Sequence, residues 1–159
     1  MTSWLLMVSA LFAQDAKAPK TPEAAFRTFM VAVFERDEPT LRAVTLPAEG
    51  FEWLLQGQVI PKDQVAAMRA QLEKMPIKVL KAGDTIKLPG NRTATVGAEE
   101  VGEDRAVLLP QGAPVPTRCR KVEGVWRVDA APIIAGRKAA DSARKAAQEK
   151  AKAKAKSKS

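Results

Sequence analysis

The sequence predicts an α+β protein in which early helices pack on a later, mostly antiparallel sheet. Three observations lead to this prediction. Between residues 21 and 75, apolar side chains recur at the spacing of amphipathic helices. After Pro76, the pattern changes to the two-residue alternation that is typical of strands. From residue 137 onward, Ala, Lys and Arg dominate, which predicts a disordered or frayed helical tail.

The first helix is expected to run from Pro22 to about Arg36. Thr21 offers a hydroxyl N-cap, Pro22 suits the first helical position, and Glu23 places an acid in the first turn. Its apolar face consists of Phe26, Phe29, Met30 and Val33. Arg27 does not share that face, so we expect its side chain to lie in solvent.

Shorter helices follow the first one. Residues 37–39, Asp-Glu-Pro, break it and start a second helix, which ends before Pro47. Residues 51–55, Phe-Glu-Trp-Leu-Leu, form an apolar patch of one or two helical turns. A further helix covers residues 61–74, and Pro76 stops it.

Six strands are expected after Pro76, in short runs that begin with clear apolar-polar alternation; the fourth, at residues 105–109, is a more continuous apolar run. Their ranges are 77–81, 85–88, 92–96, 105–109, 117–122 and 125–130. Pro-Gly-Asn at residues 89–91 marks the turn between the second and third of these strands. Since the helices precede the strands, the order indicates α+β rather than alternating βαβ units.

The last two strands form a hairpin whose register a two-residue loop fixes. With residues 123–124, Glu-Gly, as that loop, Arg120 lies opposite Arg127 and Arg118 lies opposite Asp129. The side chains on the other, core-facing side are Cys119, Trp126 and Val128. Alternation therefore separates a charged outer face from an apolar inner face.

The charged face of this hairpin allows two interpretations. Arg118, Arg120 and Arg127 form a candidate ligand-binding site for an anion. The simpler interpretation is a solvated outer face, on which opposed Arg120 and Arg127 splay apart and Arg118 pairs with Asp129. Cys119, on the inner face, is interpreted as a buried small hydrophobe rather than a reactive thiol.

The N-terminal residues 1–13 predict a signal peptide, because a predominantly apolar run of ten residues, 4–13, precedes a polar stretch. Met1-Thr2-Ser3 lacks the usual Lys or Arg, so an upstream start and a buried first strand or helix stay as alternatives. Residues 14–20 are then a linker, 21–136 the α+β domain and 137–159 a basic Lys/Ala-rich tail. This layout predicts a bacterial protein exported to the periplasm or the medium.

The positive charge is concentrated at the end of the chain. Of the formal net charge of +8, residues 14–136 contribute 17 Lys and Arg against 16 Asp and Glu, whereas residues 137–159 contribute 9 against 2. A domain-wide basic surface for specific nucleic-acid binding is therefore not expected. The tail could hold anionic polymers or a membrane surface, or simply act as a solubilising end.

The composition excludes several chemistries. The chain has no His and no Tyr, which removes Ser-His-Asp and Cys-His catalysis and the usual zinc sites. Cys119 is the single cysteine, so neither an intramolecular disulfide nor a cysteine metal cluster can form. With no glycine-rich phosphate loop either, we expect no cofactor and no metal.

The element order resembles a known superfamily. Its features are the Thr21-Pro22-Glu23 cap, Phe-Arg-Thr-Phe at residues 26–29, the break near residue 37, and the terminal hairpin Glu-Gly-Val-Trp-Arg-Val-Asp. Over about residues 21–134, this order resembles the nuclear transport factor two-like superfamily, with its SnoaL-like and ketosteroid isomerase-like domains. It is most similar to the small exported bacterial domains of unknown function in that group.

The resemblance implies a cone-like fold, in which a curved sheet wraps around a long helix with a cavity between them. It does not imply one chemistry, because the superfamily includes isomerases, dehydratases and pure binding domains. Its dehydratases tend to use a His with an Asp, and its isomerases a Tyr. This chain has neither His nor Tyr, so we assign no catalytic residue.

Three further sets of residues are candidate sites. Trp53 is a candidate ligand-binding residue at the mouth of an apolar pocket, and it fits a plain core equally well. If a cavity exists, Glu52 or Asp84 is conceivable as a base. The acidic residues Glu99, Glu100, Glu103 and Asp104 could bind calcium, but their spacing lacks the usual pattern. A solvated acidic loop near the basic tail fits them better.

The sequence thus supports three functional hypotheses in order. The first is an exported, non-catalytic domain that binds a small apolar or anionic molecule, or a partner protein. The second is an interaction protein that acts through its basic tail on anionic polymers or surfaces. The third is a carboxylate-based cavity enzyme. A homodimer through the outer sheet fits the cone-like fold, but the sequence does not decide it.

Overall fold

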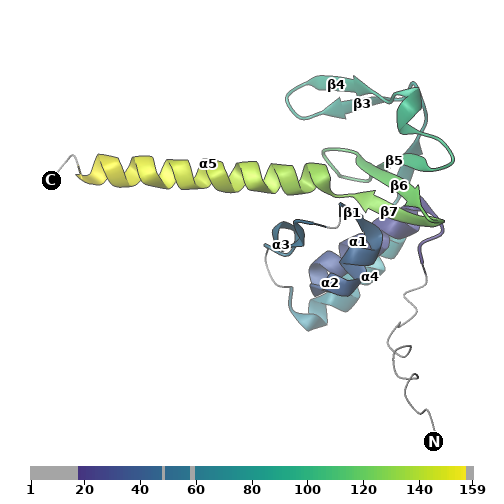
Figure 1. The fold of residues 1–159 in the computed structure, drawn as a ribbon, viewed down its shortest axis with the longest axis horizontal. Helices are drawn as coiled ribbons and strands as arrows, with labels where there is room; N and C mark the ends of the chain where they lie inside the picture. The colour runs from purple at the N-terminus through teal and green to yellow at the C-terminus, as the bar shows by residue number, and fades with distance from the viewer. Residues whose placement is uncertain (1–17, 48, 58–59, 157–159) are drawn as a thin grey trace, which may run out of the picture.

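The fold combines helices with a mixed sheet, as the sequence predicts (Figure 1). The computed structural model describes residues 18–47, 49–57 and 60–156. The predicted signal peptide, residues 1–13, lies outside the described residues. Within them, four helices precede the strands of the main sheet, except for one short strand, and a fifth helix ends the described chain.

The first four helices begin and end close to the predicted residues. They are α1 (Pro22–Glu35), α2 (Glu38–Val44), α3 (Phe51–Leu54) and α4 (Lys62–Lys74). The Thr21 hydroxyl accepts a hydrogen bond from the Ala24 backbone N–H at 3.1 Å, and Asp37 caps α2 in the same way at 3.2 Å. Side-chain acceptors at these positions satisfy amide donors that have no partner inside the helix.

Over the described residues, the main sheet has five strands in the order β1-β7-β6-β5-β2, and β3 and β4 form a separate hairpin. The six strands that the sequence predicts are β2 (Ile77–Leu80), β3 (Thr85–Leu88), β4 (Arg92–Thr95), β5 (Arg105–Pro110), β6 (Thr117–Val122) and β7 (Val125–Asp129). All pairs among them are antiparallel. The predicted α+β class is therefore confirmed.

The terminal hairpin has the predicted register. Val122 pairs with Val125, and Arg120 pairs with Arg127. The loop residues Glu123 and Gly124 have φ angles of 52° and 79°. Positive φ at both central residues is what the two-residue turn that matches the strand twist requires.

The sequence did not predict β1 (Thr45–Leu46), which pairs in parallel with β7. Thr45 is buried, and its hydroxyl donates to the Leu41 carbonyl at 2.6 Å. The Leu46 carbonyl accepts from the Ala130 N–H at 2.7 Å. Two residues are too few to show an alternation, so only the tertiary arrangement identifies this strand.

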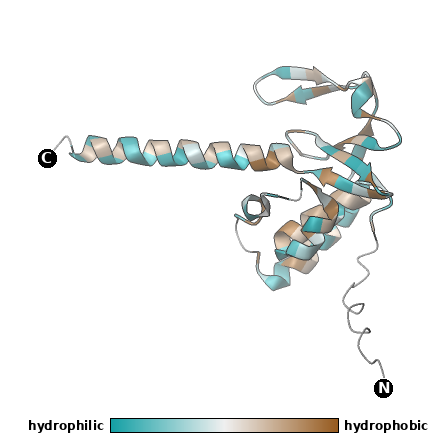
Figure 2. Cartoon of the chain, viewed as in Figure 1, coloured by the Kyte–Doolittle hydropathy of each residue, from teal (hydrophilic) through white to brown (hydrophobic). Residues whose placement is uncertain are grey.

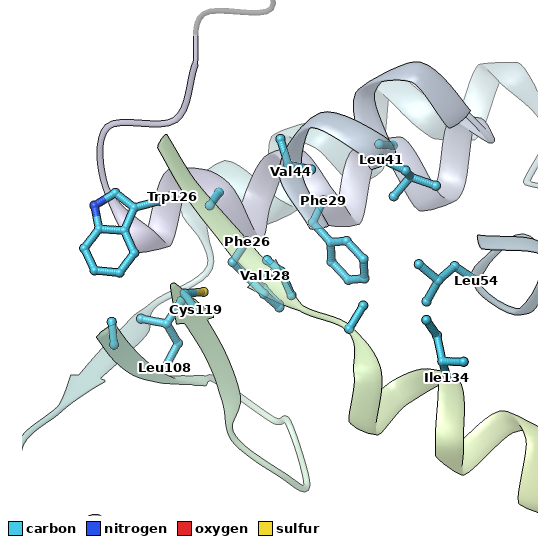
Figure 3. Packing of buried hydrophobic residues seen from close by; sticks show 14 residues of the cluster. Phe26, Phe29, Leu41, Val44, Leu54, Leu108, Cys119, Trp126, Val128 and Ile134 are labelled. Carbon is cyan, nitrogen blue, oxygen red and sulfur yellow. The ribbon is translucent and has the colours of Figure 1, made fainter. Parts of the chain in front are cut away.

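The core fills the space between the helices and the inner face of the sheet (Figure 3). Phe26 and Phe29 from α1 lie against Val128 and Leu108 from the strands, and both strand residues are fully buried. A smaller cluster lies on the other face of the sheet, beneath the β3–β4 hairpin. Its members are Leu80, Ile86, Val96 and Val107. Both faces of the sheet are thus partly covered.

Arg27 is not in solvent, and the prediction for this residue is wrong. Its Nε donates to the Leu72 carbonyl and its Nη2 to the Met75 carbonyl, each at 2.9 Å. These carbonyls lie at the C-terminal end of α4, where backbone acceptors lack partners within the helix. The guanidinium of Arg27 therefore caps the C-terminal end of α4 and joins that helix to α1.

The C-terminal segment is a single helix, α5 (Ala131–Lys156), that continues through residue 137, where the sequence places the start of the tail. Figure 1 shows α5 projecting away from the rest of the fold. Ala, Lys and Arg favour helix, and Asp141 pairs with Arg144 at 2.9 Å and with Lys145 at 2.8 Å. Of the two forms that the sequence allows for the tail, the structure has the helical one.

The N-terminal linker is attached to the body where it is described. Pro19 is buried, and its carbonyl accepts a hydrogen bond from the Trp126 N–H at 3.2 Å. This contact lies at the start of β7, where β1 does not reach. The end of the linker therefore covers part of an otherwise open strand edge.

We predict that the Cys119 thiol reacts only when the protein unfolds. Burial raises the pKa of Cys119 to about 12, and the charges of Glu23 and Asp129 add to the effect. Because the folded pKa exceeds the unfolded one, this group favours the folded state below about pH 9 and loses that contribution as the pH rises toward 12.

Labelling of Cys119 with a thiol-specific disulfide reagent at about pH 8 should follow global unfolding. A Thr93→Cys variant, which exposes a thiol on β4, is the positive control; equally rapid labelling of wild type would contradict the prediction.

Candidate functional sites: two cationic surfaces

Helix α5 is fixed to the body at its first turns. Ile134 is buried in the core. Arg137 Nη1 donates to the carbonyl oxygens of Trp53, Leu54 and Gln56 at 2.6, 2.8 and 2.9 Å. This nitrogen carries two hydrogens, so at least one of them is shared between acceptors. The contact caps the C-terminal end of α3 and sets the direction in which α5 leaves the body.

The predicted solvated tail begins at Arg137, and for this residue the prediction is wrong. The C-terminal carbonyls of α3 attract a guanidinium because they have no partners inside that short helix. The contact joins residues more than 80 positions apart in the chain. Composition correctly describes the C-terminal segment as polar. It does not reveal hydrogen-bond acceptors for Arg137 that lie so far away along the sequence.

Trp53 lies on α3, under the start of α5. Its side chain is half-buried and packs against the core, and the Lys138 ammonium lies 5.8 Å from the centre of its ring. Trp53 also borders a hollow of about 970 Å³ between α3 and α5. The other walls include Asp141, Arg144 and Lys145. Trp53 therefore packs against the core, and the hollow that it borders is charged rather than apolar.

Beyond this attachment, α5 is a cationic rod. Every residue from 142 to 156 is exposed. Residues 144–156 carry six cations against the single acid Glu149. Successive residues of a helix are rotated by about 100°, so Lys150 and Lys152 lie on opposite sides of the rod. Figure 2 shows hydrophilic residues along this part of the helix, with no continuous hydrophobic stripe.

The second cationic surface is a row of three arginines on the outer face of the main sheet. Arg105 on β5 pairs with Arg120 on β6, and Arg120 pairs with Arg127 on β7. Residues that lie directly opposite each other in a sheet share a face, with Cβ atoms about 4.5–5.5 Å apart. Ala106 and Cys119, the next pair along, lie in the core, so the arginines point away from it. We call Arg105, Arg120 and Arg127 the arginine row.

The structure brings together two of the three arginines predicted for an anion site and gives the third another partner. Arg118 Nη2 lies 2.5 Å from Glu100 Oε1, so the expected pairing with Asp129 is replaced. Asp129 instead accepts from the Ala131 N–H at 3.2 Å, at the start of α5. Alternation along β6 correctly placed Arg118 on the outer face, but it could not show that Glu100 would reach it.

Sequence reasoning missed Arg105 as a member of the row. Its place opposite Arg120 depends on the β5–β6 register, and the intervening segment, residues 111–116, is too long to fix a register by turn type. The sequence contains only a weak signal, namely an arginine at the first position of a predicted strand. The hairpin between β6 and β7 carried no such ambiguity.

The acidic loop before β5 contacts these arginines rather than the tail. The Glu99 carbonyl accepts from Arg105 Nη1 at 2.8 Å, and Asp104 Oδ1 lies 4.0 Å from Arg105 Nε. Glu100 accepts from the Gly97 N–H at 2.9 Å and pairs with Arg118. Within the described residues, no group of three acidic or cysteine side chains is placed to hold a metal ion.

The two carboxylates considered as bases lie in ordinary surroundings. Glu52 is an exposed residue of α3. Asp84 Oδ2 accepts from the Lys81 N–H at 3.0 Å, in the turn before β3. Neither lies inside the core between α1 and the sheet.

Comparisons with known proteins identify no relative: no family model, no curated protein and no solved structure matches the chain. Among the described helices, none is both apolar enough and long enough to cross a membrane.

We predict a pH-dependent contribution to stability from Glu100. Its pKa is lowered, chiefly by the hydrogen bond from the Gly97 N–H and then by Arg118. Because its pKa is lowered, the Glu100 carboxylate stabilises the folded state above about pH 4.5. This stabilisation is lost as the pH falls through the pKa that Glu100 has in the folded protein. Urea unfolding at about pH 6 and about pH 3 should therefore show a smaller acid-dependent loss for Glu100→Gln than for wild type. Identical losses would contradict the assignment, and the exposed Glu73→Gln variant serves as the control.

Proposed function

We propose that the protein is an exported, non-enzymatic binding protein that engages a flexible anionic polymer through α5, with the α+β domain as its carrier. The observation that carries this proposal is the form of α5. The helix is anchored at Arg137 and then exposes cations on every side over residues 144–156. Its 26 residues correspond to a length of roughly 39 Å.

Packing of the body favours this function over ligand binding in a cone-like cavity. The space between α1 and the sheet contains Phe26, Phe29, Leu108 and Val128, all buried. A hollow of about 410 Å³ does lie between α1 and α4, but Arg27, Glu35 and Arg69 are among its walls. A small apolar ligand would gain little there, because such ligands favour enclosed apolar pockets.

The distribution of cations favours a polymer over a flat membrane surface. Lys150 and Lys154 lie on one side of the helix, and Lys152 and Lys156 lie on the opposite side. A flat surface can contact one of these sides at a time, whereas a flexible polyanion can wrap around the rod. Peripheral helices that enter membranes also need an apolar face, which residues 144–156 lack.

Sequence-specific recognition of nucleic acid is not part of this proposal. Helix α5 contains no aromatic residue on which bases could stack. The attraction would come from release of counterions from the polyanion, which depends on charge density rather than on sequence. A chain of phosphate, sulfate or carboxylate groups fits these requirements.

Export and family membership complete the proposal on sequence grounds. The apolar run of residues 1–13 supports export, and an exported protein with a cationic arm would meet anionic envelope polymers. Membership of the nuclear transport factor two-like superfamily stays a prediction. A carboxylate-based enzyme is the least supported alternative, since Glu52 and Asp84 lie outside the core.

We predict that neutralising the end of α5 weakens polyanion binding in a salt-dependent way. The variant replaces Lys150, Lys152, Lys154 and Lys156 by Gln, and binding to long-chain polyphosphate is measured by fluorescence anisotropy at several salt concentrations. Loss of four phosphate contacts should reduce the slope of log K against log salt by about 3.

The matched control replaces four exposed lysines of the body, Lys62, Lys74, Lys81 and Lys87, by Gln, so that the net charge falls equally. This control variant should keep most of the slope of log K against log salt that the wild type shows. If both variants lose the same amount, the body and α5 contribute alike and the proposed role of α5 is wrong. Circular dichroism would verify that α5 stays helical in both.

A further inference from the structure

We infer that the arginine row on the outer face of β5, β6 and β7 binds a single phosphate-class oxyanion, at a site separate from α5. Arg105, Arg120 and Arg127 lie on three adjacent strands at directly paired positions. Like charges that lie directly opposite each other across a sheet are destabilising. Two such pairs share Arg120, so the row concentrates positive charge that an anion would neutralise.

The carboxylates of the acidic loop leave this row largely without counter-charge. Glu100 is committed to Arg118, in the adjacent row of the same face. The one carboxylate within ion-pair distance of the row, among the described residues, is Asp104, and its oxygen lies 4.0 Å from Arg105 Nε. Arg105 Nη1 uses a neutral backbone acceptor, the Glu99 carbonyl. The acids therefore neutralise Arg118 more completely than the row.

Two guanidinium groups of the row have unused donors. Arg127 Nε is buried and has no hydrogen-bond partner in the part of the chain that the structure describes. The Arg120 side chain is exposed and makes no hydrogen bond or ion pair within residues 18–47, 49–57 and 60–156. A buried polar donor without an acceptor is costly, and most such groups in folded proteins are satisfied by protein, water or an ion.

A tetrahedral oxyanion matches the donors that the row offers. Each guanidinium presents several N–H groups in a planar fork that suits phosphate oxygens, and charge-assisted hydrogen bonds are stronger than neutral ones. Because neighbouring strands lie about 4.8 Å apart, the outer two arginines start roughly 10 Å apart, and their long side chains can reach one anion bound over Arg120. Phosphate could reach the site free in solution or as a monoester group of a larger molecule.

The test is a titration of the full-length protein with inorganic phosphate, followed through the arginine Nε–Hε signals by NMR at constant ionic strength. To keep polyanion binding out of the measurement, the α5-neutralised variant is titrated beside wild type. We expect saturable shifts at Arg105, Arg120 and Arg127 in both proteins. Chloride at the same ionic strength should leave these signals in place.

The Arg120→Gln variant should bind phosphate about tenfold more weakly, because it removes one charge-assisted contact at an exposed residue that the fold does not need. Arg92→Gln, on the β3–β4 hairpin, is the matched control and should bind like wild type. Unchanged affinity in Arg120→Gln, or uniform unsaturable shifts at all arginines, would overturn the inference. Titration with phenyl phosphate then distinguishes free phosphate from a monoester group as the source. Phenyl phosphate that binds as tightly as free phosphate indicates a site open on one side, which accepts a monoester. Weaker binding of phenyl phosphate indicates a site for the free ion.

Discussion

The contact between the Arg137 guanidinium and the last carbonyls of α3 determines how the two parts of this protein are joined. Helix α3 has only four residues, and isolated helices of that length do not form in water. Arg137 supplies the missing donors at its C-terminal end, and Ile134 anchors the same turn of α5 in the core. One side chain thus stabilises a short helix and orients a long one.

The same physical device appears elsewhere in the body. Arg27 on α1 caps the end of α4, and Arg36 Nη2 donates to the Gly57 carbonyl at 3.0 Å. At the end of α4, as at the end of α3, a guanidinium replaces the backbone donors that the chain does not provide after a helix ends, whereas Gly57 lies beyond α3 in the following bend. Part of the arginine content of a nearly neutral body is therefore structural.

Local patterns in the sequence predicted most of the fold, because they depend on residues close together in the chain. The Thr21 cap, the six strands and the β6–β7 register follow from capping, alternation and a two-residue turn. What the sequence could not predict depends on distant partners: the strand β1, the acceptors of Arg27 and Arg137, and the position of Arg105 beside Arg120. Of the candidate sites, the cationic character of the C-terminal segment was evident from composition, whereas its attachment through Arg137 and Ile134 was not.

The attachment of α5 can be measured directly with two spin labels, one at Glu73→Cys on α4 and one at Ala151→Cys near the end of α5. The native Cys119 is buried and stays unlabelled. Pulsed electron paramagnetic resonance would give the distribution of distances between the labels. A single narrow population in wild type that broadens in Arg137→Ala would support an α5 oriented by its contact with α3. A broad distribution in wild type, unchanged by Arg137→Ala, would contradict it.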